Sequence, residues 1–167
     1  WSQNPALALY DYFTNSFYGL GESYAKMDYT AWTGAANVCD ESITLDAGGT
    51  HARYECDGVI DTANAIKGNI EALTACMGGR IGYVDGKYFA QAAKYYTPTI
   101  TIDESHMVGA ITIQTKQSRR SMYNAVKGTF LSEEKNYTLV DYPAKISSSY
   151  ATADGDPIYL DMPLPFV

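Results

Sequence analysis

Hydrophobic residues recur at helical spacing in the first quarter of the chain. In residues 29–42 they fall three or four positions apart, and Asp28 stands just before, where its carboxylate can accept amide hydrogen bonds. Asn4 followed by Pro5 is a second helix start, because Asn caps free amides and Pro needs no hydrogen bond in a first turn. The pattern predicts helices over Pro5–Thr14 and residues 29–42. The apolar face of the second consists of Trp32, Ala35, Ala36, Cys39 and Ile43.

A third helix is predicted over residues 62–77. Asp61 or Thr62 can cap its start, and Gly78 can end it, because glycine adopts the left-handed conformation that closes many helices. We expect its apolar stripe to cover one face of a sheet. The stripe consists of Ile66, Ile70, Leu73 and Met77.

The strongest strand signal is a hairpin over residues 81–90. Asp85 and Gly86 separate two strand-like runs, and Asp-Gly suits a turn in which both central residues have positive φ. Residues 103–108 are predicted as a single helical turn capped by Asp103. Further strands are predicted at residues 51–60, 99–102, 110–115, 122–131 and 137–140.

These elements predict an α+β fold with three helices packed on a mostly antiparallel sheet. Its centre is a strand, helix and hairpin unit over residues 52–94. We expect an N-terminal helical part at 1–50, an α+β core at 51–140 and an extended, proline-rich C-terminal arm at 141–167. Together they are expected to form one structural domain that belongs to a longer chain.

Composition narrows the possible partners. Apolar residues make up 46% of the 167 and charged residues 19%, which is typical of a folded protein. A net charge of −7 argues against nucleic acid, since phosphate binding needs clustered cations, and Lys116, Arg119 and Arg120 form the only basic group. No apolar run reaches about 18 residues, so the sequence predicts no membrane anchor.

The cysteines and histidines do not form a recognisable metal or redox motif. Cys39, Cys56 and Cys76 lie far apart without a CxxC pair, and we expect them to be small buried side chains. One disulfide with one spare thiol remains an alternative. His51 and His106 have no second ligand at metal-binding spacing.

A glycine-rich stretch and three acidic pairs are the other candidates for chemistry. Residues 82–87 resemble a phosphate-binding loop, but the spacing is one residue short and Tyr88 replaces the required Ser or Thr. Paired carboxylates could hydrolyse glycosides, but nothing in the sequence ties any pair to a cleft. The sequence therefore predicts no catalytic, cofactor-binding or metal-binding residues. The acidic pairs are Asp40 with Glu41, Glu133 with Glu134, and Asp154 with Asp156.

Fifteen tyrosines are the compositional oddity of the chain. Tyrosine combines a broad apolar ring with a polar hydroxyl and is enriched at interfaces. The excess fits a protein-binding surface, a sugar-binding surface or a tyrosine-rich core.

An ordered set of segments resembles one family across nearly the whole chain. The segments are "NPALALYDYFTNSFYGLG", "AANVCDE", "YECDGVIDTANAIKGNIEALTACMGGRIGYVDGKY", "SRRSMYNAVKGTF", "VDYPAKISSSYATADGD" and "LPFV". In this order they are similar to tail tip attachment or host-specificity proteins of long-tailed bacteriophages, which are related to baseplate hubs. The connection "LDAGGT" is shorter than in many members of that family, so contacts made there do not carry over.

The resemblance implies a structural role without catalysis or cofactor. The family forms a trimeric hub that closes the tail tube, contacts the distal tail ring, and carries downstream parts that recognise the host. It implies a place in the virion, at the tail tip, after assembly in the host cytoplasm. Two alternatives are a glycan-binding adhesion module and a tail-associated cell-wall hydrolase.

Overall fold

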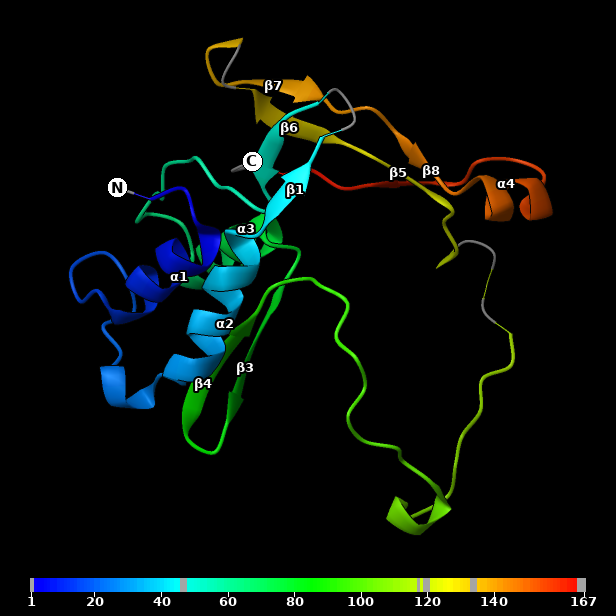
Figure 1. The fold of residues 1–167 in the computed structure, drawn as a ribbon, viewed down its shortest axis with the longest axis horizontal. Coiled ribbons are helices and arrows are strands. Elements are labelled where there is room, and N and C mark those ends of the chain that lie inside the picture. Colours follow the sequence, from blue (N-terminus) through cyan, green and yellow to red (C-terminus); the bar gives the residue numbers. More distant parts are fainter. Residues whose placement is uncertain (1, 46–47, 117, 119–120, 133–134, 165–167) are drawn as a thin grey trace. The chain divides into compact units, whose positions relative to one another are not determined.

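The computed structural model describes residues 2–45, 48–116, 118, 121–132 and 135–164. Helices and strands are mixed along these residues, so the expected α+β class is confirmed (Figure 1). The helices are α1 (Pro5–Thr14), α2 (Tyr29–Cys39), α3 (Ile66–Cys76) and α4 (Ser148–Asp154), with short 3-10 turns η1 (Tyr24–Lys26) and η2 (Glu104–His106). The strands are β1 (Ser42–Thr44), β2 (Thr50–Ala52), β3 (Arg80–Val84), β4 (Lys87–Gln91), β5 (Ala125–Lys127), β6 (Thr129–Ser132), β7 (Thr138–Asp141), β8 (Lys145–Ile146) and β9 (Tyr159–Asp161). No described helix is long and apolar enough to cross a membrane.

The chain divides into two compact units, each built from separate stretches. Unit 1 comprises Trp1–Lys94, Thr129–Asp141 and Pro163–Val167, and unit 2 comprises Tyr95–Gly128 and Tyr142–Met162. Unit 1 holds α1 to α3 and the sheets β1-β2, β3-β4 and β6-β7, whereas unit 2 holds α4 and the sheet β8-β5-β9. The division into 1–50, 51–140 and 141–167 stays a prediction.

Helix α1 begins as the sequence predicts. The Asn4 side-chain oxygen accepts hydrogen bonds from the amides of Ala6 (3.0 Å) and Leu7 (3.2 Å). The Asn4 side-chain amide also donates to the Ala36 carbonyl oxygen at 3.0 Å, so the capping residue ties α1 to α2. Asn4 is buried, and this arrangement satisfies both ends of its side chain.

Helix α2 covers the hairpin, which corrects the expectation that the stripe of α3 would cover a sheet. Helix α2 packs against β4 and α1, whereas α3 packs against α1. Within the stripe, Leu73 and Met77 are buried, but Ile66 is half exposed. Helix α3 starts four residues later than predicted, because the Asp61 carboxylate caps a separate turn by accepting from the Ala63 amide at 2.8 Å.

The hairpin β3-β4 has the predicted turn. Asp85 and Gly86 both have positive φ, at 51° and 78°, between antiparallel strands. Gly78 closes α3 with φ at 53°, as expected. Gly82 lies opposite Phe89, and a Cβ added there would come within 2.4 Å of the Phe89 ring, so this position has to be glycine for the ring to pack.

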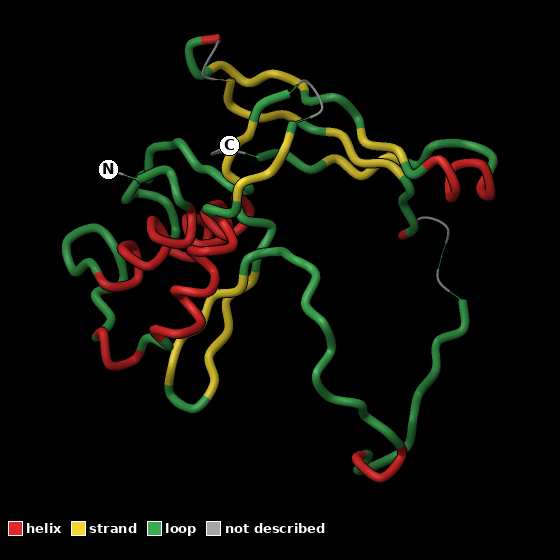
Figure 2. The backbone as a smooth tube through the Cα atoms, viewed as in Figure 1, coloured by secondary structure: helices red, strands yellow, loops and turns green. Residues whose placement is uncertain are grey.

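Several predicted strands are shorter than expected or are not formed. Residues 53–60 continue from β2 without strand structure, and the predicted strand at 122–131 divides into β5 and β6. The strands at 99–102 and 110–115 are wrong predictions: these residues lie in a long connection that is helical only at η2 (Figure 2). Alternating Thr and Ile favour strands, but a strand also needs a neighbouring strand to pair with.

Residues 142–162 are more regular than the predicted extended arm. Helix α4 ends at Gly155, which has φ at 90°, and β8 and β9 flank β5 on opposite sides. Strand β9 runs parallel to β5, whereas β8 is antiparallel. The buried Asn124 organises this end of unit 2, because its side chain donates to the Asp154 carboxylate (2.9 Å) and accepts from the Ile158 amide (2.7 Å).

Replacing Gly86 by Val should destabilise the hairpin through its backbone. A Cβ at Gly86 meets no atom within 4 Å, so the cost comes from forcing a branched residue into the left-handed region, about 1–2 kcal/mol. Urea unfolding followed by circular dichroism measures this loss. Gly86→Asn is the control, since Asn tolerates positive φ, and a Val variant no less stable than the Asn variant would contradict the assignment.

Candidate interaction surfaces

The two histidines lie in separate surroundings. His51 Nε2 is 3.2 Å from Glu55 Oε2, and His106 Nδ1 is 2.9 Å from Asp103 Oδ1. In the part of the chain that the structure describes, no three His, Cys, Asp or Glu side chains are grouped so as to hold a metal ion.

Asp103, Ser105 and His106 contain the residue types of a catalytic triad, but their geometry is that of a helix cap. The Ser105 hydroxyl (2.5 Å) and the His106 ring (2.9 Å) both reach Asp103 Oδ1, and the Ser105 amide donates to the same oxygen. A triad instead places the carboxylate on one ring nitrogen and the hydroxyl on the other. Hydrogen bonds from Ser105 and His106 lower the pKa of the exposed Asp103 carboxyl.

The first acidic pair is divided between two roles. Glu41 binds Lys94 Nζ (2.9 Å) and Arg53 Nε (3.2 Å), and these cations, Lys94 foremost, lower the pKa of its carboxyl. Asp40 is the C-terminal capping residue of α2 and lines a hollow described below.

The third acidic pair, Asp154 with Asp156, belongs to a turn that Asn124 holds. Asp154 is held by Asn124 in the turn at Gly155, and the carbonyl oxygen of Asp156 accepts from the same side chain at 3.2 Å. Glu133, Glu134, Arg119 and Arg120 lie outside the described residues.

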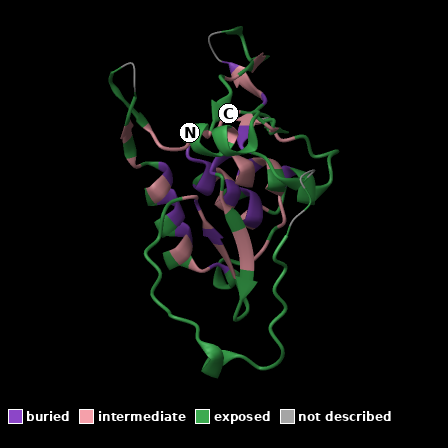
Figure 3. Ribbon diagram, turned by 90° about the vertical axis from the view of Figure 1, so that its right-hand side faces the viewer, coloured by how far each residue is buried: buried purple, intermediate pink, exposed green. Residues whose placement is uncertain are grey.

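Most tyrosines are exposed, which argues against a tyrosine-rich core. Ten of the fifteen are on the surface, and Tyr12 is the tyrosine of the buried core, where its hydroxyl accepts from Asn69 at 3.1 Å. Figure 3 shows the buried positions concentrated along the helices of unit 1. The excess of tyrosine therefore serves surfaces.

An aromatic hollow of about 290 Å³ lies where α1 and α2 meet. Tyr10, Tyr29 and Trp32 supply its rings, and Asn37 and Asp40 supply polar groups. The ring centres of Tyr10 and Trp32 are 5.4 Å apart in an edge-to-face contact, and burial raises the pKa of the Tyr10 hydroxyl. No sequence motif marks this hollow, although its lining residues 29, 33, 37 and 40 fall at helical spacing on α2.

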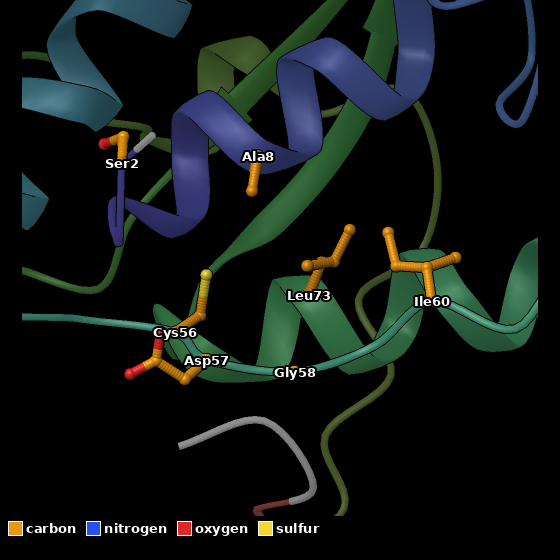
Figure 4. A pocket seen from close by; sticks show the side chains of 7 residues that line it. All are labelled: Ser2, Ala8, Cys56, Asp57, Gly58, Ile60 and Leu73. Carbon is orange, nitrogen blue, oxygen red and sulfur yellow. The ribbon is translucent and has the colours of Figure 1, made fainter.

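Two further hollows meet at Cys56. One, of about 180 Å³, is lined by the side chains drawn in Figure 4, from the start of the chain, α1, α3 and the loop that precedes α3. The other, of about 360 Å³, is lined by both Cys56 and Cys76. Cys39 lies in the buried core, and burial raises the pKa of its thiol to about 11. The expectation of buried cysteines thus holds for Cys39 and Cys76, whereas Cys56 is half-buried.

The connection at residues 95–116 in unit 2 is exposed throughout. Ile100, Ile102, Ile111 and Ile113 are 59–76% exposed, although each alternates with Thr or another polar residue. We call this segment the isoleucine arm. Its two alternating stretches place isoleucines on one side of an extended backbone and mainly polar residues on the other.

Comparison with known proteins tests the resemblance to phage tail proteins that the sequence motifs suggest. No protein-family model matches the chain. The chain is 28% identical over 139 residues to Tip attachment protein J of Escherichia phage SECphi27. The match covers 82% of this chain and 12% of that protein, so the chain spans about an eighth of the relative. The resemblance to phage tail tip attachment proteins is confirmed by this similarity.

Proposed function

We propose that this chain is a structural part of a bacteriophage tail tip and acts through protein–protein interfaces. The similarity to a tip attachment protein over 82% of the chain carries the proposal. The exposed tyrosines and the isoleucine arm support it, because both provide apolar surface of the kind that protein partners cover. The role is structural and not enzymatic.

The finer proposal is a segment of a trimeric hub in the virion. In this proposal the full-length protein is assembled in the host cytoplasm, contacts the distal tail ring and the tube, and helps to shape the path of the exiting DNA. Other parts of the full-length protein would bind the host receptor. The net charge of −7 is consistent with contacts to protein and not to the DNA itself.

The isoleucine arm is the proposed contact with a neighbouring tail-tip chain. Ile100 and Ile102 share one side of their stretch, and Ile111 and Ile113 share one side of theirs. A strand from a neighbouring chain could pair with either stretch and cover its isoleucines. Burial of one such side chain is worth roughly 1.5–3 kcal/mol before ordering costs are subtracted.

Incorporation into virions tests the role. A phage that lacks the gene is complemented in trans with the full-length gene in one of three versions. The first is unchanged, the second carries Ile100→Asp and Ile113→Asp, and the third carries Thr101→Asp and Thr112→Asp. We expect the two isoleucine substitutions together to lower the amount of this protein in purified particles at least tenfold, because they place two charges in the contact. The threonine pair adds the same charge to the polar side of the same stretches and should assemble.

Immunoblots of purified particles and of cell extracts separate assembly from expression. An unchanged full-length protein that is made but absent from particles would overturn the tail-tip function. If the proteins with the isoleucine and the threonine substitutions are incorporated equally, the proposed contact through the isoleucine arm is overturned, but the tail-tip function is not.

The aromatic hollow favours one second candidate, a glycan-binding surface. Aromatic rings can stack on sugar rings, and nearby amide and carboxylate groups can bind the sugar hydroxyls. The hollow has both kinds of group, and Tyr29 at the rim of the hollow is 74% exposed. No such observation favours the hydrolase alternative. Among the described residues, Glu55 and Asp57 are the one pair of carboxylates that lines the same hollow of these three. Asp57 already accepts a hydrogen bond from the Gln3 side chain at 2.9 Å.

A glycan array followed by titration tests this candidate. If the hollow binds sugars, Tyr29→Ala should weaken binding at least tenfold, because a stacking ring is lost. Tyr150→Ala is the matched control, since Tyr150 is similarly exposed (67%) but lies on α4 of unit 2. Absence of binding to any cell-surface glycan, or equal losses in both variants, would exclude the hollow as a glycan site.

A further inference from the structure

Two cysteines from different elements meet in unit 1. Cys76 is the last residue of α3, and Cys56 lies in the loop between β2 and α3. The Cys56 and Cys76 side chains interact with each other, and both line the hollow of about 360 Å³. The two thiols are therefore neighbours at the wall of an accessible hollow.

The surroundings hold the pair in place. The Cys56 amide donates to the Gln3 carbonyl oxygen at 2.8 Å, and the Cys76 sulfur lies 3.3 Å from the Ala72 carbonyl oxygen. Neighbouring Asp57 is bound to the Gln3 side chain at 2.9 Å, and in Figure 4 its carboxylate points away from the Cys56 sulfur. Cys76 is buried and Cys56 is half-buried, so a reagent reaches Cys56 first.

We propose that Cys56 and Cys76 form a reactive dithiol that closes to an intramolecular disulfide in exchange with a low-molecular-weight disulfide. The Cys56 thiolate attacks one sulfur of the small disulfide, forms a mixed disulfide and releases one small thiolate. Cys76 then loses its proton to solvent and its sulfur attacks Cys56, which releases the second small thiolate. The two protein thiols are oxidised by two electrons, and the small disulfide is reduced to two thiols.

The order of the two steps follows from the contact. The interaction with Cys76 lowers the pKa of the Cys56 thiol, so Cys56 holds more of the attacking thiolate. The same interaction and burial raise the pKa of the Cys76 thiol, which suits the later step. Cys39 belongs to neither hollow, and its raised pKa keeps it unreactive.

The bridge would link the end of α3 to the loop that leads into it. It closes about 20 residues, and loop closure of this size stabilises a fold by restricting the unfolded chain. In the tail-tip role the protein leaves a reducing cytosol for an oxidising exterior, where the bridge would form. That use of the bridge rests on the proposed function, whereas the reaction of the two thiols does not.

Oxidation of the purified 167-residue chain with glutathione disulfide tests the proposal. After alkylation of free thiols and proteolysis, mass spectrometry should find the Cys56 and Cys76 peptides joined and Cys39 alkylated. The melting temperature should rise by about 6–12 °C and return when dithiothreitol is added. A folded chain with both thiols still free, or a bridge that includes Cys39, would overturn the proposal.

Single variants assign the two roles. Cys39→Ser should form the bridge as the unchanged chain does, whereas Cys76→Ser should stop at one glutathione on Cys56. Cys56→Ser should take up no glutathione at Cys76. Equal modification of Cys76 in that variant would contradict the order of attack.

Phenylarsine oxide provides a readout that does not depend on redox potential. The arsenic of this reagent binds two adjacent thiols, so it should protect Cys56 and Cys76 from alkylation in the folded, reduced chain. Loss of that protection in Cys56→Ser or Cys76→Ser, with Cys39→Ser unaffected, is the expected result. Protection that persists in both single variants would contradict the pair. None of these measurements requires virions, so a negative result leaves the tail-tip proposal standing.

Discussion

The carbonyl oxygen of Tyr88 is the point on which the arrangement of unit 1 depends. It accepts a hydrogen bond from the Trp32 indole (2.9 Å) and another from the Asp28 amide (2.9 Å), so the start of α2 is fixed to β4. Phe13 of α1 packs against both the Trp32 and the Tyr88 rings, with centres 5.6 and 5.1 Å apart. A buried indole needs a partner for its N–H, and leaving it unpaired costs about 1–3 kcal/mol. This geometry therefore excludes most other placements of α2 on the hairpin.

The aromatic hollow of unit 1 involves the same tryptophan. The Trp32 indole N–H points to the hairpin, and the Trp32 ring also makes the edge-to-face contact with Tyr10 in the aromatic hollow between α1 and α2. Helix α3 packs on α1, and its Leu73 joins the same buried core. Its last residue, Cys76, thus meets the loop after β2 at Cys56. The contact between Trp32 and Tyr88 thus fixes the helix that lines the hollow, whereas the thiol pair depends on the packing of α3.

Local chemistry could be predicted from the sequence, and long-range pairing could not. The caps at Asn4 and Asp28 and the turn at Gly86 depend on neighbours within a few residues, and all three are as predicted. The start of α3 was misplaced because Asp61 caps a nearby turn just as well. The stretch at 99–102 has the composition of a strand, but composition does not provide a strand to pair with. Cys56 and Cys76 carry no motif, and their contact arises from the packing of α3 alone.

The isoleucine arm and the thiol pair require different kinds of partner. The arm exposes four branched apolar side chains at alternate positions, and covering such a row takes a continuous surface of another chain. The thiol pair lines a hollow of about 360 Å³, and the proposed reaction needs only one sulfur of a small disulfide to reach Cys56. The arm belongs to unit 2 and both cysteines belong to unit 1, so the proposed contact and the proposed disulfide use different residues. The proposed assembly contact and the proposed oxidation can therefore be tested by separate substitutions, because no residue takes part in both.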